Sequence, residues 1–130
     1  MTPRLRQHFK ATSNNATNPN QNVCGQAVCR ALGVADAVRY IHTMDDILRA
    51  ARLAWSARSR MSKLGKRRSV GAARALCAKV AREEGARAFI ASIKGHVLLL
   101  DHNGETLIDT APRSRDRRQL DGLWAIFPKS

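Results

Sequence analysis

A histidine and an aspartate flank a turn near the end of the chain, in the segment GHVLLLDHNGETLIDT that covers residues 95–110. Alternating apolar positions around the pair Asn103 and Gly104 predict a β-hairpin with these two residues as its loop. In that register His96 and Asp109 become diagonal neighbours on one face, about 7–8 Å apart. An imidazole beside a carboxylate is the general-base half of a nucleophilic catalytic site. The other half has to come from elsewhere in the chain.

Cys24 is the residue predicted to supply the nucleophile. Apolar spacing in NVCGQAVCRALG, residues 22–33, predicts a short helix with Cys24 in its first turn. The positive end of a helix and its unpaired N–H groups lower the pKa of a thiol, which would leave the thiolate ready. The small Gly25 would let a substrate approach. Cys29 lies about 140° further around the helix, so its side chain cannot face the same site as that of Cys24. Cys77 is predicted to be a core residue.

The elements that would position these residues follow from changes of period along the chain. Helices are predicted at residues 22–33, from Thr43 until Gly65 breaks the pattern, and at residues 69–84. Strands are predicted at residues 86–93, 96–102, 105–109 and 123–127. Helices followed by antiparallel strands predict an α+β domain, with N-terminal helices packed on a small antiparallel sheet. Residues 1–22 read as a polar lead-in, and residues 23–130 as a single domain.

Several classes of protein are disfavoured by composition. The chain has 130 residues and no apolar run near the roughly 20 residues that span a bilayer. Its N-terminus lacks the apolar core of a secretory signal. Three cysteines, an odd number at irregular spacing, suit a reducing compartment better than a disulfide scaffold. The expected location is therefore the cytoplasm, although delivery into a host cell by a phage or a secretion machine would need no signal.

A net charge of +13 makes an anionic partner, either nucleic acid or an acidic protein, the main alternative to a catalytic function. Basic residues concentrate after Thr43 and again in the loop APRSRDRRQLDG, residues 111–122. The residues expected to contact such a partner are Arg49, Arg52, Lys63, Lys66, Arg67 and Arg68. No helix-turn-helix, zinc or RNA-binding signature accompanies them. A basic face of this kind is also common on proteins that bind no polyanion.

Cys24 at the start of a helix, His96 opening a strand and Asp109 on the next strand together resemble the papain-like superfamily. The likeness is closest to its compact bacterial and phage branches, which include papain-fold toxin domains, CHAP-type amidases and transglutaminase-like proteins. It rests on NVCGQAVCRALG and GHVLLLDHNGETLIDT, about a fifth of the chain. The resemblance implies a Cys24–His96–Asp109 triad acting on an amide of a protein or peptide substrate. It also implies a polar oxyanion-hole residue just before the cysteine, for which Gln21 is the preferred candidate.

Two further interpretations compete with the enzyme. A metal site built from Cys24, Cys29, His96 and His102 is disfavoured, because the two histidines would stand about 20 Å apart along one strand. We therefore expect no metal and no cofactor. The second alternative is a catalytically inactive papain-like scaffold that binds a host protein. Nothing in the sequence specifies an oligomeric state.

Overall fold

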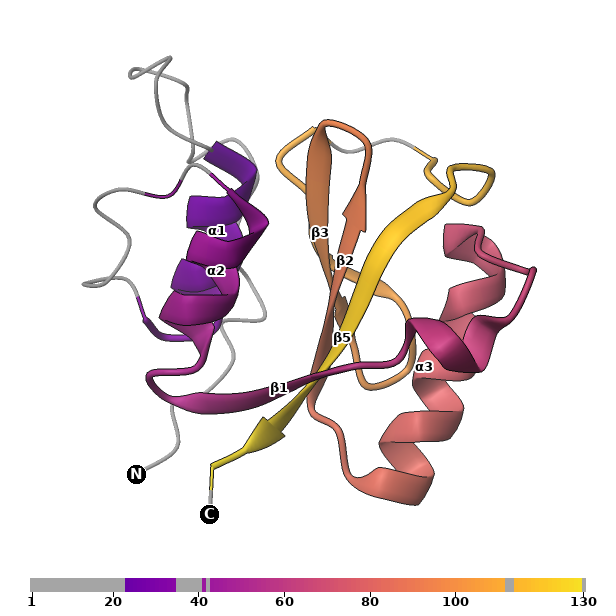
Figure 1. Ribbon diagram of the computed structural model, residues 1–130, viewed down its shortest axis with the longest axis horizontal. Coiled ribbons are helices and arrows are strands. Elements are labelled where there is room, and N and C mark those ends of the chain that lie inside the picture. The colour runs from indigo at the N-terminus through magenta and orange to yellow at the C-terminus, as the bar shows by residue number, and fades with distance from the viewer. Residues whose placement is uncertain (1–22, 35–40, 42, 112–113, 130) are drawn as a thin grey trace.

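An antiparallel sheet separates two groups of helices in the computed structural model, which describes residues 23–34, 41, 43–111 and 114–129 (Figure 1). The helices are α1 (Val23–Ala31), α2 (Met44–Ala51) and α3 (Val70–Glu84), with a short 3-10 helix, η3 (Met61–Leu64). The strands are β1 (Trp55–Ser59), β2 (Ala88–Ile93), β3 (His96–Asp101), β4 (Thr106–Ile108) and β5 (Leu120–Pro128). They lie in the order β1-β5-β2-β3-β4. The expected α+β class with an antiparallel sheet is confirmed.

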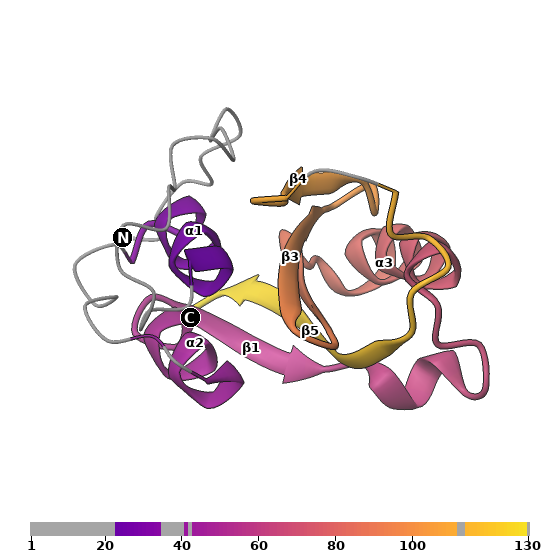
Figure 2. The same ribbon diagram turned by 90° about the horizontal axis from the view of Figure 1, so that it is seen from above.

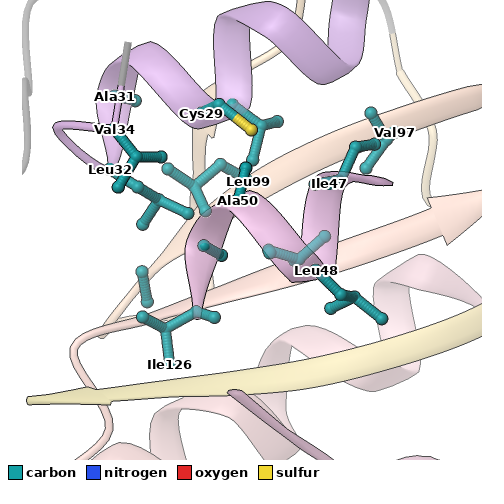
Figure 3. Packing of buried hydrophobic residues seen from close by; sticks show 14 of the residues in the cluster. Cys29, Ala31, Leu32, Val34, Ile47, Leu48, Ala50, Val97, Leu99 and Ile126 are labelled. Atoms are coloured by element: carbon teal, nitrogen blue, oxygen red, sulfur yellow. The ribbon is translucent and has the colours of Figure 1, made fainter. Parts of the chain in front are cut away.

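Helices cover both faces of the sheet. Helices α1 and α2 lie on one face and α3 on the other, as Figure 2 shows from above. Alternation along β3 divides its side chains accordingly: Val97 and Leu99 pack with α1 and α2, whereas Leu98 and Leu100 pack with α3. Figure 3 shows the first of these clusters, in which Leu99 lies near Cys29 (Figure 3). A sheet buried on both faces explains the unbroken apolar run VLLL.

The ends of the helices follow the predicted signals. Thr43 and Asp46 form a reciprocal capping box at the start of α2, in which each side chain accepts a hydrogen bond from the other residue's backbone N–H. Ser69 caps α3 by accepting from the N–H of Ala72, and Gly85 ends that helix. The predicted starts of α2 and α3, at Thr43 and Ser69, are confirmed. Asn22, where the first helix is predicted to begin, lies outside the described residues.

The predicted long helix after Thr43 is wrong beyond Ala51. Residues 55–59 form the edge strand β1, which pairs with β5 about 70 positions later in the chain. Trp55 is buried, and its indole N–H donates to the carbonyl of Leu32 at 2.7 Å. Leu53, in the connecting turn, is 66% exposed. Pairing with a distant strand overrides the local helical pattern, because strand formation depends on neighbours that local sequence does not contain.

The turn between β3 and β4 also differs from the prediction. Its loop has three residues, 102–104, instead of two: the N–H of Asp101 donates to the carbonyl of Glu105, and the N–H of Gly104 to the carbonyl of Asp101. The Asp101 carboxylate accepts from the N–H groups of Asn103 and Glu105. Only Gly104 of these residues has a positive φ, 81°. This is a type I turn closed by a left-handed glycine, not a type I′ turn.

A β-bulge corrects the register that the longer loop shifts. Next to the turn Leu100 pairs with Thr106, one position away from the predicted partner Leu107. The register then changes, and Leu99 pairs with Ile108, which is the predicted pair. The extra residue, Leu107, therefore compensates for the extra loop residue. Beyond the bulge, the side chains lie on the faces of the hairpin that the sequence predicts.

Gly104 is predicted to tolerate no side chain. A Cβ there would overlap the backbone carbonyl of Arg74 on α3, whose guanidinium donates to the carbonyl of Gly104 at 2.9 Å. We expect Gly104→Ala to lower the free energy of unfolding by about 3 kcal/mol or more, from backbone strain and overlap together. The matched control is Gly95→Ala, at φ 75° with open space around it, which should cost only about 1–2 kcal/mol. Urea denaturation followed by tryptophan fluorescence measures both, and equal losses would contradict the prediction.

Among the helices that the described ranges contain, none combines the length and the apolar character that a membrane span requires.

Candidate active site

Cys24 lies in the first turn of α1, where the helix packs against β3. Three backbone N–H groups act by hydrogen bonding to lower the pKa of its thiol, those of Val97, Gly25 and Cys24 itself. The last two belong to the helix N-terminus, where N–H groups lack partners within the helix. Val97 follows His96 directly on β3. The thiol therefore lies beside the strand that carries the predicted base.

The N–H of Val97 can reach the thiol because β4 is short. A two-residue turn joins β2 to β3, so that Ile93 pairs with His96 next to the turn. In an antiparallel ladder the following residue, Val97, directs its N–H away from β2 and toward the opposite side. On that side the ladder with β4 begins only at Leu99. The first residues of β3 therefore have no strand beside them on this edge, and the N-terminus of α1 packs there.

Burial raises the pKa of the Cys24 thiol above its ordinary value, which contradicts the expected lowering. The N–H groups of Val97, Gly25 and Cys24 do act to lower this pKa, and the negative charge of Asp109 acts to raise it. Desolvation disfavours the charged thiolate. This effect on the pKa is larger than that of the three hydrogen bonds. The prediction of a ready thiolate is therefore wrong. Cys24 is a thiol at neutral pH, and it would need a base in order to act as a nucleophile.

Gly25 does not have the role predicted for it. A Cβ at this position would lie 2.8 Å from Cδ1 of Ile47 and 2.9 Å from Cγ2 of Ile41. The residue thus faces the core, and its lack of a side chain lets α1 approach α2 closely. It provides no approach path for a substrate.

His96 and Asp109 are in direct contact, as the hairpin register predicts. Nε2 of His96 lies 2.7 Å from Oδ1 of Asp109, and their side chains are only 13% and 4% exposed. An ionised carboxylate can only accept, so Nε2 of the neutral ring carries the proton. The lone pair of the imidazole is then on Nδ1. This tautomer leaves a ring nitrogen able to accept a proton from a nucleophile.

Arg115 completes the cluster and was missed as a site residue. Its side chain is 3% exposed; Nε donates to Oδ2 of Asp109 at 3.1 Å, and Nη2 donates to the carbonyl of Ala111 at 2.7 Å. In the sequence it is one of several arginines in the loop 111–122, which reads as a solvent-exposed basic segment. Only its proximity to Asp109, six residues earlier, distinguishes it from its neighbours. The structure assigns this arginine to the interior.

The pKa of Asp109 is held below its ordinary value. Burial alone would raise this pKa. Hydrogen bonds from Arg115, from the N–H of Ala111 and from His96 lower it by more than burial raises it. Hydrogen bonds to the charged form of a carboxyl stabilise that form. Asp109 is therefore a carboxylate at neutral pH, fixed on both oxygens.

The other two cysteines are core residues. Cys29 and Cys77 are fully buried, and burial raises the pKa of each thiol to about 12. None of the three cysteines forms a disulfide. Cys24 alone among them is partly exposed.

These environments predict a selective alkylation. We expect iodoacetamide to modify Cys24 of the native protein before Cys29 or Cys77, at a rate that rises with pH. Because only the thiolate reacts and burial raises the Cys24 pKa, the rate should reach half its maximum above pH 9.0, the ordinary value. Peptide mass spectrometry after timed labelling at several pH values measures the rate at each thiol. Equal rates at all three, or a Cys24 midpoint near pH 6, would contradict this.

The remaining predicted residues do not form one surface. Gln21 lies outside the described residues, so its role at an oxyanion hole stays a prediction. Arg49 is on α2, and Arg52 follows that helix and donates to the carbonyl of Ala57. The other four predicted basic residues lie across the sheet between η3 and the start of α3: Lys63, Lys66, Arg67 and Arg68. The break of the predicted helix into α2, β1 and η3 separates the two groups.

Within the described ranges, no group of three or more histidine, cysteine or acidic residues is arranged to hold a metal ion. His102 is an exposed residue of the β3–β4 loop. Comparison of the chain with protein-family models, with curated proteins and with solved structures gives no match. The geometry described above is therefore the basis for assigning a function.

Proposed function

We propose that the chain is a thiol-dependent acyl-transfer enzyme with a papain-like arrangement, acting on an amide of a protein or peptide. Cys24 is the nucleophile, His96 the general base and Asp109 the residue that orients it. One observation carries the proposal. The pKa of the Cys24 thiol responds to the N–H of Val97, next to His96 on β3, and to the charge of Asp109, the carboxylate that contacts His96.

The chemistry follows from the protonation states. In the resting site the thiol is protonated, and Nδ1 of His96 has a lone pair. As the sulfur attacks the amide carbon, His96 takes the thiol proton and becomes an imidazolium, which the carboxylate of Asp109 stabilises. The imidazolium then gives that proton to the leaving amine, and a thioester to Cys24 remains. Water or an amine attacks the thioester with His96 again as base, which releases the acyl group and restores the thiol.

Arg115 acts on this chemistry through Asp109. Its guanidinium fixes the carboxylate in the orientation that accepts from Nε2 of His96, and keeps it ionised. Arg115 is thus a positioning residue. The oxyanion formed during attack would be bound by the backbone N–H of Cys24, with Gln21 as the proposed side-chain donor.

Acylation by p-nitrophenyl acetate tests the proposal without knowledge of the natural substrate. We expect rapid release of p-nitrophenolate and an acetyl group on Cys24, detected by peptide mass spectrometry, both lost in Cys24→Ala. Acetylation of lysines, which this basic chain will also show, serves as the internal reference. If Cys24 is acetylated no faster than a cysteine in a short unstructured peptide, the chain is an inactive scaffold and the proposal fails.

A further inference from the structure

A basic groove lies on the side of the molecule away from Cys24, between η3 and the first half of α3. Its volume is about 660 Å³. Four basic residues line it, Lys63, Lys66, Arg67 and Arg68, together with Gln119 and the apolar side chains of η3 and α3. None of its lining residues is acidic.

Three of the four cations are available to a ligand. Lys66, Arg67 and Arg68 are exposed, and none forms an ion pair with another described residue. Lys63, in contrast, lies 3.3 Å from a carboxylate oxygen of Glu84. Arg68 donates from Nε to the carbonyl of Gly65 and lines the groove. Lys66, Arg67 and Arg68 together concentrate positive charge at the groove, and no carboxylate of the described residues forms an ion pair with them.

The N-terminus of α3 does not itself bind the ligand. The N–H of Val70 donates to the carbonyl of Arg118, and that of Gly71 to the carbonyl of Asp116. The next N–H group donates to the Ser69 hydroxyl. The carboxylate of Asp116 lies 2.9 Å from Nε of Arg74 and is neutralised there. An anion in the groove would therefore be held by the side chains of the rim.

We propose that the basic groove binds the phosphate backbone of double-stranded nucleic acid. A concave site with cations on its rim, an apolar floor and no carboxylate fits a linear polyanion. The groove has no aromatic lining residue, and binding of single strands relies on stacking of bases on aromatic side chains. A duplex offers the higher density of phosphate charge and needs no such platform. The proposal concerns contacts to phosphates, which carry no sequence preference.

Two triple variants of equal charge test this proposal. Lys66→Ala/Arg67→Ala/Arg68→Ala removes the groove cations, and the control removes three exposed basic residues elsewhere, Lys94→Ala/Arg82→Ala/Arg87→Ala. Fluorescence anisotropy with a labelled mixed-sequence DNA duplex of about 20 base pairs measures the affinity. We expect the groove variant to bind at least about 10-fold more weakly at moderate salt, with a salt slope reduced by about 2–3. The control should change affinity by less than about 3-fold.

Each result decides the matter. Equal weakening in both triples would show attraction to net charge alone and overturn the groove assignment, as would full binding by the groove variant. Competition by polyglutamate as effective as that by unlabelled duplex would assign the groove to acidic proteins instead. The inference is independent of the proposed catalysis: Cys24→Ala should bind DNA normally, and the groove triple should still be acetylated at Cys24.

Discussion

Replacing His96 with alanine is expected to slow the acetylation of Cys24 by p-nitrophenyl acetate by about 100- to 10,000-fold. The reason lies in the protonation state of the nucleophile. Burial raises the pKa of Cys24, so few molecules carry a thiolate at neutral pH and a base must remove the proton during attack. Without His96, reaction depends on the small thiolate fraction. Initial rates of p-nitrophenolate release, with the acetyl group mapped by mass spectrometry, give the ratio.

Two controls separate a base from a structural residue. His102→Ala removes an exposed histidine from the same hairpin and should leave the rate unchanged within about 2-fold. Added imidazole should restore part of the rate of His96→Ala, because a small base can enter the space that the side chain leaves; a packing role would not respond to it. If His96→Ala acetylates at the normal rate, or if imidazole has no effect on a folded His96→Ala, His96 is not the base.

Replacing Arg115 with alanine is expected to lower the free energy of unfolding by about 3–5 kcal/mol. Asp109 is 4% exposed, and its removal from water is offset by the guanidinium bonded to it. Loss of one partner leaves the other as a buried charge without full compensation, which costs more than the pair contributes. Urea denaturation followed through Trp55 and Trp124 measures the loss. Arg117→Ala, an exposed arginine of the same loop, should change stability by less than about 0.5 kcal/mol.

The pKa of Asp109 also predicts the direction in which the stability changes with pH. The folded-state pKa of Asp109 lies below its ordinary value of 3.8, so the stability it contributes is complete above that pH. The contribution is lost as the pH falls through the lower, folded-state value. In Arg115→Ala the main cause of the lowering is removed, and the loss should begin at a higher pH. A double variant, Asp109→Asn/Arg115→Met, should be more stable than Arg115→Ala alone. Identical acid profiles in the wild type and Arg115→Ala would contradict the assignment.

The parts of the fold that local sequence determines could be predicted from it. Thr43, Ser69 and Gly85 mark helix ends by interactions within a few residues, and all three lie where the patterns indicate. The contact between His96 and Asp109 is predicted from parity along one hairpin with a two-residue loop, and it forms because the bulge in β4 offsets the third loop residue. In each case the partners are separated by few residues. Short separation makes the geometry a property of the local chain.

The parts that depend on distant partners could not be predicted in the same way. Strand β1 exists because β5 lies beside it, and the segment containing Trp55 has helical spacing when considered alone. The pKa of Cys24 is set by how deeply α1 packs beside β3, which the helix pattern does not reveal. Arg115 belongs to a loop whose composition indicates solvent exposure. Its burial depends on where the loop closes over Asp109.

The compensation between the three-residue loop and the bulge at Leu107 limits how this hairpin can change length. A single insertion or deletion in either feature would move Asp109 by one position and direct its carboxylate to the opposite face from His96. Two changes made together, one in the loop and one at the bulge, would restore the parity. Variation in this region is therefore expected in coupled pairs of residues, and a relative with a two-residue loop should also lack the residue that corresponds to Leu107.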